Sequence, residues 1–393
     1  MRGTAGSGGV DSVNRFTDLL FGDLRRSDQR RWAHAYVLGL LTTPGKKSMR
    51  RLAAAASDSP TAAQALHQFI NESPWDWRPV CDRLRHWIEG RVRPRAWTIA
   101  PVVLPKRGER SCGVHRRFIP HTGRTVNCQV GTALFMSADI GDFPCGWSLL
   151  LPEPWARGDL RERARVPDAA VARPESPVLS LIELLLRPSR HEPVPVVVGV
   201  DGYLDVRPLL HVLIRARRDF VVAVPDGLPL APFPAARPVR ARPRAAARML
   251  DGPSGPERAV RGLVRNQLVQ LPFARDEQRP QPFRLFAGPG TRADSSGRLW
   301  LTNIVDRPVG ELMQYADRTA AVGETVSLLE RGFGLRDFEG RSFPGWHHHM
   351  TLVSAAFAHS RLTTAADGHG ALDMPGDWSR ESDFDRSMDL LSA

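Results

Sequence analysis

Residues 193–201 read PVPVVVGVD, a nearly continuous apolar run that is typical of a strand buried on both faces of a sheet. The stretch that follows, VRPLLHVLIRARR at 206–218, has apolar residues at helical spacing. A second apolar run, DFVVAVP, comes next at 219–225. A strand, a helix and another strand in this order indicate an α/β sheet, so we expect the α/β fold class.

Segments on either side extend this sheet and add helices. Residues 96–150 alternate with a period of two and contain three strand-like runs, AWTIAPVVLP, VNCQVGTALFMSAD and FPCGWSLLLP. Helical patterns occupy 13–90 and 175–187. Closer to the C-terminus, the pattern predicts a hairpin over 283–304, a helix pair over 308–333 and a closing helix over 346–362.

These patterns divide the chain into six parts. The short helices of 13–95, with basic residues between them, resemble a helix-turn-helix DNA reader, although a cap that packs on the next domain would have the same pattern. Residues 226–258 are rich in proline and arginine and indicate a solvated linker, with an arm that follows a polyanion as the alternative. The parts are a flexible N-terminus at 1–12, the helical and DNA-binding domain at 13–95, the sheet domain at 96–225 and 296–362, an insertion or linker with a hairpin at 226–295, and a disordered acidic tail at 363–393.

The charge of the chain indicates an acidic partner. Its 54 lysines and arginines exceed its 42 aspartates and glutamates, which gives a net charge of +12. Only Lys46, Lys47 and Lys106 are lysines, and the planar guanidinium of arginine suits contacts with phosphate groups. We therefore expect a nucleic acid as the partner.

Composition also excludes several classes of protein. The sequence has no run of about 18 uncharged apolar residues, so no membrane span is expected. The N-terminal stretch lacks a long apolar segment before a cleavage site, which argues against secretion. The four cysteines, Cys81, Cys112, Cys128 and Cys145, are too few for a disulfide scaffold, so a reducing cytoplasm is expected.

Seven short stretches share their order with one family of DNA enzymes. They resemble the DDE transposases of bacterial insertion sequences, in the branch whose catalytic domain is RNase H-like. The resemblance implies an RNase H-like mixed sheet flanked by helices, a role in DNA transposition, and double-stranded DNA as the partner. The stretches are QFINESPWDW (68–77), PKRG (105–108), VHR (114–116), NCQV (127–130), LLLPEPW (149–155), WLTN (300–303) and FEGRSFPGWHHH (338–349).

An enzyme of this family needs three carboxylates that meet at one edge of the sheet. Two hard cations about 3.5–4 Å apart polarise the attacking and leaving oxygens of the DNA. Mg²⁺ prefers oxygen ligands, which the three acids supply. The resemblance implies a first aspartate just before the PKRG turn, a second at the end of the central strand, and a glutamate on a late helix.

The first of these positions has no acid in this chain. Ala100 and Pro101 stand where the first aspartate belongs, and neither side chain binds a cation. The nearest other acids on the sheet, Asp139 and Asp142, lie in a predicted turn and are expected to be solvated.

The other two acids are each displaced by one residue. Asp201 follows the second position, Val200, and one step along a strand turns a side chain to the opposite face. Glu324 follows the third position, Gly323, and one step along a helix rotates a side chain by about 100°. Asp201 and Glu324 are interpreted as relic or partial metal ligands, or alternatively as a turn aspartate and a solvated helix acid.

Basic side chains around the PKRG turn are candidates for phosphate contacts, with a solvated basic turn as the alternative. Neighbouring histidines on a helix diverge by about 100° and cannot all chelate one ion, so His347 and His348 are expected to pack or to contact DNA phosphate. The candidate DNA-binding residues are Lys106, Arg107, Arg110, Arg116, Arg117, His347 and His348.

Three tryptophans allow a further kind of contact with DNA. Trp75, Trp77 and Trp155 could stack on extruded bases, because an aromatic face accepts any base. Packing of the helical region on the sheet explains the same residues.

We predict a DDE-type transposase-family protein that binds DNA, is related to transposition and lacks strand cleavage. Two alternatives stay open, an active Mg²⁺-dependent transposase with displaced carboxylates and a repurposed protein-interaction module. No cofactor is expected unless the chain is an active enzyme, in which case Asp201 and Glu324 would bind Mg²⁺. The prediction includes a homodimer.

Overall fold

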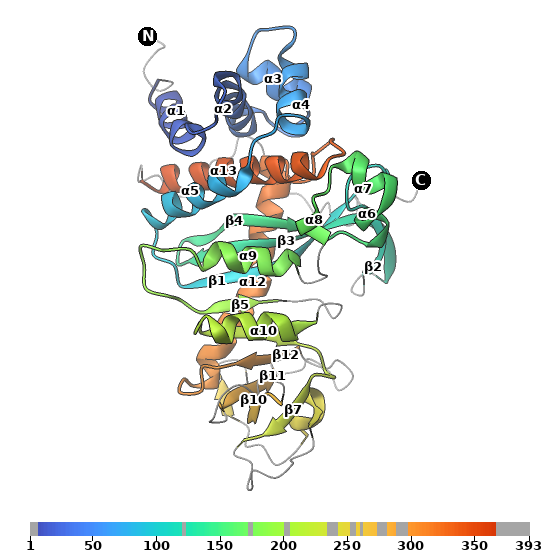
Figure 1. The fold of residues 1–393 in the computed structure, drawn as a ribbon. Coiled ribbons are helices and arrows are strands. Elements are labelled where there is room, and N and C mark those ends of the chain that lie inside the picture. The colour runs from blue at the N-terminus through green and yellow to red at the C-terminus, as the bar shows by residue number, and fades with distance from the viewer. Residues whose placement is uncertain are drawn as a thin grey trace.

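The computed structural model describes residues 7–119, 123–171, 176–199, 205–233, 243–251, 257–259, 262–272, 281–287 and 298–366. Helices gather at one end of the molecule, and the strands follow one another below them (Figure 1). Further helices lie on both sides of the sheet. The expected mixed α/β architecture with N-terminal helices is confirmed.

Twelve strands of the described residues form one mixed sheet (Figure 1). Their order is β2-β3-β1-β5-β6-β12-β11-β10-β7-β8, with β4 paired to β3 and β9 paired to β10. The strands are β1 (Ala96–Pro105), β2 (His115–Ile119), β3 (Arg124–Ala138), β4 (Gly141–Leu149), β5 (Val196–Val198), β6 (Phe220–Val224), β7 (Pro229–Pro232), β8 (Arg244–Ala245), β9 (Glu257–Ala259), β10 (Gly262–Gln270), β11 (Phe283–Ala287) and β12 (Leu299–Thr302).

β1 and β5 occupy the centre of the sheet. β1 pairs antiparallel with β3 along its full length and parallel with β5, which pairs parallel with β6. Val196, Val197 and Val198 are completely buried because helices cover both faces of the sheet here. The strand expected within 193–201 is confirmed, and the structure limits it to these three residues.

Helices cover both faces and one end of the sheet. α9 and α10 lie on one face, and α12 crosses the other (Figure 1). α5 and α13 pack against β4, and α1 to α4 form a second layer on them. The helices are α1 (Ser7–Phe21), α2 (Ser27–Thr42), α3 (Met49–Ala56), α4 (Ala62–Asn71), α5 (Trp77–Glu89), α6 (Glu153–Ala156), α7 (Gly158–Ala164), α8 (Asp168–Val171), α9 (Ser176–Leu185), α10 (Val206–Arg215), α11 (Ala246–Met249), α12 (Val309–Phe333) and α13 (Phe343–Ala366).

Stacked rings join the N-terminal helical region to α13. His348 stacks on Trp75 with ring centres 3.9 Å apart, and His347 stacks on Trp77 at 4.4 Å. Both tryptophans come from the short SPWDW stretch that leads into α5. The helical region and the sheet also share one hydrophobic cluster. This packing supports the cap interpretation of 13–95, whereas a DNA-reading role for these helices stays a prediction.

His349 connects three helices. Its Nε2 lies 3.0 Å from the carbonyl oxygen of Gly334, which can only accept, so Nε2 carries the proton. Its Nδ1 then accepts from the hydroxyl of Tyr36 on α2 at 2.9 Å. Gly334 ends α12 with φ 70°, and a Cβ at this position would lie 2.7 Å from that of Lys47. His349 therefore ties α2 and the end of α12 to α13.

Two interpretations of the C-terminal half are wrong. The described part of 226–258 is not a solvated linker, because Leu230 is buried and β7 pairs with β10. Residues 308–333 are not a helix pair but the single helix α12 of 25 residues. Gly323 lies inside it without breaking it, since an internal glycine costs only about 1 kcal/mol.

The two predicted disordered ends fall largely outside the described residues. At the N-terminus, 7–12 belong to α1 and not to the flexible segment expected at 1–12, and 1–6 lie outside the description. At the C-terminus, α13 extends to Ala366, and 367–393 lie outside it. The hairpin expected over 283–304 is confirmed by the antiparallel pairing of β11 with β12. No helix in the described ranges has both the length and the apolar character needed to cross a bilayer.

The buried, neutral His349 makes stability depend on pH. Burial lowers the pKa of His349 to about 3, and the nearby Lys106 adds to this shift. In the unfolded chain histidine titrates near 6.5, so the unfolded state takes up the proton first and the native state loses stability as pH falls from about 6.5 toward 3. We expect His349→Phe to lower the free energy of unfolding at pH 7.5 by about 2 kcal/mol or more, because Tyr36 and Gly334 lose their partner.

Urea unfolding of wild type and His349→Phe at pH 7.5, 6.0 and 4.5 measures this effect. The difference between the two proteins should shrink as the pH falls, since only the wild type carries the titrating ring. A difference that stays constant across this range would show that His349 does not titrate with unfolding.

Candidate functional site

The fold brings together the segments of β1, β5 and α12 that lead to the positions where the family resemblance places acids, although Val200 itself lies outside the described residues. β5 lies beside β1, and the amide of Gly199 donates to the carbonyl oxygen of Ile99 at 2.8 Å. α12 crosses this pair of strands, and a Cβ on Gly199 would lie 3.0 Å from the side chain of Thr319. The end of β5, the middle of β1 and one turn of α12 therefore meet at one place.

The side chain that β1 presents there is a methyl group. Ala100 pairs with Ala133 of β3 and is 4% exposed. It has the same parity in β1 as Ala96, which belongs to the cluster beneath α12, so its side chain lies on the α12 face. Pro101 is half-buried and carries no oxygen ligand either.

On α12 the expected position also lacks an acid. Gly323 is exposed, and a Cβ built on it would have no neighbour within 4 Å. Glu324 is exposed on the adjacent part of the helix surface. Asp201 lies outside the described residues, so the structure does not place the second relic candidate.

The described residues do not fit the Mg²⁺ ions that an active enzyme of this family would hold. A two-metal centre needs several carboxylates within reach of one another. Within the described ranges, no group of three or more His, Cys, Asp or Glu side chains could hold a metal ion. Ala100 supplies no metal-binding atom where β1, β5 and α12 meet.

Asp142 is buried, which corrects the expectation that it is solvated. It is 8% exposed, because it pairs with Ser137 in the sheet and its carbonyl accepts from Thr325 of α12 at 3.5 Å. Its Oδ1 has no hydrogen-bond partner in the part of the chain that the structure describes. Burial raises the pKa of the Asp142 carboxyl, Glu324 adds to the rise, and Ser137 and Arg318 oppose it.

Asp139 has the expected exposed position. It forms an ion pair with Arg95 at 2.8 Å, and this hydrogen-bonded partner lowers the pKa of the Asp139 carboxyl. Glu324 of α12 thus acts on the Asp142 carboxyl only through its charge, whereas Asp139 is paired with Arg95. Sequence reasoning missed the burial of Asp142, because the IGD turn signal gave no sign that α12 covers this end of β4.

The PKRG turn separates into one anchoring lysine and exposed arginines. The Nζ of Lys106 donates to the carbonyl oxygens of Arg336 at 3.2 Å and Phe338 at 3.0 Å. Burial lowers its pKa to about 8. Lys106 thus holds the FEGR loop against the turn, a role that the surface interpretation did not foresee. The hydroxyl of Ser111 strengthens the same contact by donating to Gly340 at 3.1 Å.

The arginines of this region lie on its surface. Arg107 and Arg110 are exposed in the β1–β2 connection, and Arg116 is exposed on β2. Arg117 points to the opposite face of β2 and is half-buried. DNA contact by Arg107, Arg110 and Arg116 is compatible with their exposure and stays a prediction.

His347 and His348 are buried, which is the packing role that the sequence left open for them. They are 4% and 1% exposed, and neither reaches the surface to meet a phosphate group. Burial lowers the pKa of His348 to about 4 and holds that of His347 well below its ordinary value. The expectation of phosphate contacts by these two histidines is therefore wrong for this structure.

Replacing Ala100 with aspartate tests the geometry of the vacant first position. The new carboxylate would be buried without a partner, so Ala100→Asp should lower the free energy of unfolding by about 3 kcal/mol. Adding 5 mM Mg²⁺ or Mn²⁺ should not restore the melting temperature. Ala55→Asp, at an exposed alanine of α3, is the matched control and should change stability little. A selective rise in the melting temperature of Ala100→Asp with Mg²⁺ would show that other acids converge there.

Asp142 gives a second prediction, with the opposite sign. Because folding raises its carboxyl pKa above the ordinary 3.8, the native state loses stability as pH rises from about 3.8 through the higher folded value. Asp142→Asn removes this cost, so the variant should be more stable than wild type at pH 7 and equal to it near pH 3. A less stable variant at pH 7 would show that the carboxylate is held by a favourable partner such as Arg318.

Comparison with known proteins identifies the family of this chain. The family model described as DDE superfamily endonuclease matches residues 19–273. Among solved structures, a piggyBac transposase in a synaptic complex with hairpin DNA is similar at 11% identity, with a TM-score of 0.44, over 94% of this chain and 75% of that chain. No curated protein matches the chain significantly. Since the family model covers more than half of the sequence, the chain belongs to the DDE superfamily endonuclease family.

Proposed function

We propose that this chain is a DNA-binding protein of the DDE transposase family that does not cleave DNA strands. The observation that carries the proposal is Ala100, a buried methyl group where β1, β5 and α12 meet. Cleavage by two metal ions needs a carboxylate at this place, and neither Ala100 nor Pro101 supplies one. The chain thus has the fold of the family but lacks a carboxylate that strand cleavage requires.

The arrangement of strands supports the more specific family assignment. The order β4-β3-β1-β5-β6, with three antiparallel strands followed by parallel ones, agrees with an RNase H-like domain of an insertion-sequence transposase. All four cysteines are buried free thiols, which agrees with a reducing compartment such as the cytoplasm. A homodimer stays a prediction.

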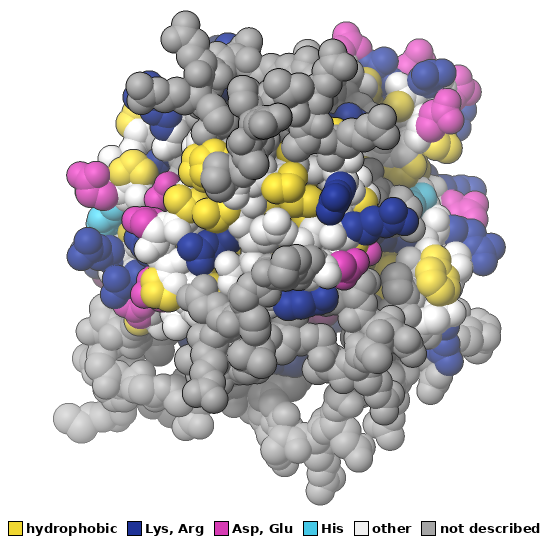
Figure 2. All heavy atoms as spheres, turned by 90° about the horizontal axis from the view of Figure 1, so that it is seen from below, with side chains coloured by type: hydrophobic (Ala, Val, Ile, Leu, Met, Phe, Trp, Pro, Cys, Tyr) yellow, Lys and Arg dark blue, Asp and Glu magenta, His cyan; other side chains and the backbone are white. Residues whose placement is uncertain are grey.

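The connection between β1 and β2 is our proposed DNA contact. Arg107, Arg110 and Arg116 are exposed there, and the buried Lys106 fixes the turn that carries them. The side chain of Asn127 also donates to the carbonyl oxygen of Gly108 at 3.0 Å. A fixed turn loses little conformational freedom on binding, which favours contact with phosphate groups. On the face seen in Figure 2, basic side chains are interspersed with acidic and apolar ones, and we place no DNA there.

One observation favours an active enzyme as the second candidate. Asp142 has a buried oxygen without a partner among the described residues, and Glu324 lies close enough to raise its pKa. These two acids could bind Mg²⁺ together with Asp201. We rank this candidate below the first because Asp142 lies at the Ala96 end of β1, away from Ala100.

DNA binding is tested by the salt dependence of affinity for a 30-base-pair duplex of mixed sequence. For six or more phosphate contacts, affinity should fall about 10³-fold between 50 and 200 mM salt. Arg116→Gln should weaken binding and reduce the salt slope by about 1. Arg215→Gln, an exposed arginine of α10, is the control and should leave both unchanged. Absent or salt-insensitive binding would favour the protein-interaction alternative.

Strand cleavage is tested with supercoiled plasmid and pure protein in 5 mM Mg²⁺ or Mn²⁺. The proposal predicts that no nicked product accumulates above a protein-free control. Nicking that disappears in Asp201→Ala or Asp142→Asn would establish the active enzyme instead. Comparing these variants with Asp139→Asn separates loss of a ligand from loss of any surface acid.

A further inference from the structure

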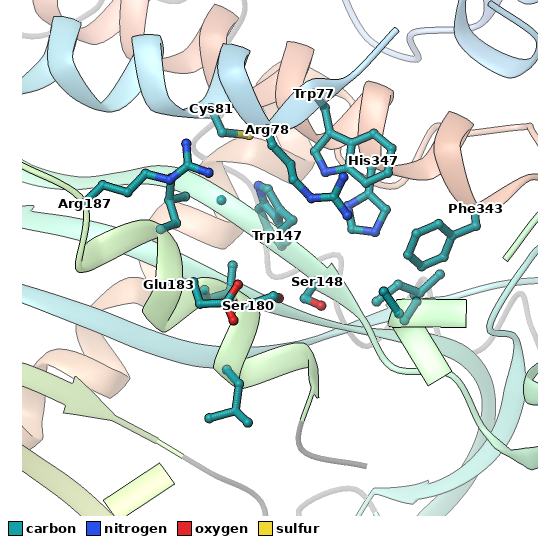
Figure 3. A pocket seen from close by; sticks show the side chains of 17 residues that line it. Trp77, Arg78, Cys81, Trp147, Ser148, Ser180, Glu183, Arg187, Phe343 and His347 are labelled. Atoms are coloured by element: carbon teal, nitrogen blue, oxygen red, sulfur yellow. The ribbon is translucent and has the colours of Figure 1, made fainter. Parts of the chain in front are cut away.

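A cavity of about 410 Å³ lies between α5, β4, α8, α9 and α13 (Figure 3). Its volume falls within the range of small-ligand sites, roughly 300–1,000 Å³. Trp77, Trp147, Phe343 and His347 give it an aromatic lining, and leucines of β4 and α9 complete the apolar walls. It is separate from the place where β1, β5 and α12 meet.

His347 has two polar atoms that are left unpaired within the described part of the chain. Neither ring nitrogen has a hydrogen-bond partner among the described residues, although the side chain is 4% exposed. The backbone of Trp147 lies near enough to the ring to oppose the lowering of its pKa, although the contact does not have the geometry of a hydrogen bond. A buried polar atom without a partner is unfavourable, so a ligand that pairs one of these nitrogens is bound more tightly.

Surrounding rings fix the orientation of this imidazole. Trp77 stacks on one face of it, with the two ring planes 8° apart. The ring centres of Phe343 and Trp346 lie 4.5 and 4.9 Å from the centre of the imidazole. Burial keeps the ring neutral, so it offers one N–H donor and one acceptor. A heteroaromatic ring whose edge carries both donors and acceptors is complementary to it.

The rim of the cavity is predominantly basic. The guanidinium carbon of Arg78 lies 5.1 Å from the ring centre of Trp77. Arg187 follows α9 and also lines the cavity (Figure 3). Glu183 is the acid among the lining residues. Arg78 and Arg187 also form ion pairs with Asp76 at 3.5 Å and Asp82 at 3.6 Å, and both arginines remain partly exposed. Two guanidinium groups at the mouth favour a ligand whose outer part is an anion such as phosphate.

We propose that this cavity binds a nucleobase that carries a phosphate group, with the base inside against His347 and the phosphate between Arg78 and Arg187. Such a ligand has two sources, an extrahelical nucleotide of bound DNA or a free mononucleotide. The first source rests on the proposed DNA binding, and the second does not. The base edge pairs one ring nitrogen of His347, and the aromatic lining covers the faces of the base.

The fluorescent base 2-aminopurine tests the proposal in three probes. They are a duplex with one unpaired 2-aminopurine nucleotide, the same duplex with that base paired, and free 2-aminopurine deoxyribonucleoside 5′-monophosphate. We expect the full chain to bind the unpaired-base duplex at least tenfold more tightly than the paired duplex and to change its fluorescence. If a free nucleotide is the source, the monophosphate binds and the duplexes show no such difference.

Three variants assign the effect to the cavity. His347→Phe keeps the stack on Trp77 and removes both nitrogens, Arg78→Gln removes one guanidinium, and Ala169→Trp fills the rim from α8. Each should abolish the tenfold preference, or the monophosphate binding, while affinity for the paired duplex stays within about threefold. Arg215→Gln should leave every probe unchanged. Should thermal melting show that His347→Phe does not fold, Arg78→Gln and Ala169→Trp decide.

The outcomes separate this proposal from the proposed function. Salt-dependent binding of the paired duplex, with neither a preference for the unpaired base nor monophosphate binding, overturns the cavity proposal and leaves DNA binding standing. Monophosphate binding that the three variants abolish, without duplex binding, supports the cavity and overturns DNA binding. A preference for the unpaired base that survives all three variants also overturns the proposal, because the base then binds elsewhere.

Discussion

The burial of β1 is the constraint on which the rest of the structure depends. This strand is paired along its length with β3 and shares its other edge with β5, while α12 crosses one of its faces. A side chain in its middle on the α12 face therefore needs either to be small and apolar or to have a partner. Ala100 satisfies the first condition. A carboxylate here would need cations and further acids to offset its desolvation.

α13 is the helix that connects the sheet to the N-terminal helices. It packs against β4 on one side and carries the N-terminal helices on the other, and its consecutive histidines project toward different neighbours. His348 and His349 have polar partners in the protein, whereas the ring nitrogens of His347 have none in the described part of the chain. All three histidines of this run are packed in the core, and His347 also lines a cavity. This difference distinguishes the proposed ligand site from ordinary core packing.

Much of the architecture could be predicted from local patterns. The strand expected within 193–201 and the period-two segments of 96–150 form, and the closing helix expected over 346–362 forms as α13, which is longer than predicted. Failures occurred where tertiary contacts overruled composition. The proline- and arginine-rich stretch looked solvated, yet Leu230 and Met249 in it are buried and anchor it to the sheet. The pattern over 308–333 predicted a helix pair, but α12 is a single helix that continues through Gly323.

The candidate site was predicted less completely than the fold. The absence of an acid at Ala100 was readable from the sequence, because the flanking motifs gave the register. The burial of Lys106, His347 and His348 could not be predicted from the sequence, because the charge or ring of a side chain does not show which side of its helix or strand is covered. The burial of Asp142 depends on α12, which lies more than 160 residues later in the chain.

The central claim is that this chain does not hold a pair of catalytic cations. Electron paramagnetic resonance of Mn²⁺ added to the full-length protein with duplex DNA tests it most directly, because two Mn²⁺ ions about 4 Å apart couple magnetically. We expect only the spectrum of free or singly bound Mn²⁺. A coupled Mn²⁺ pair that disappears in Asp201→Ala would contradict the claim and show that the metal centre is intact.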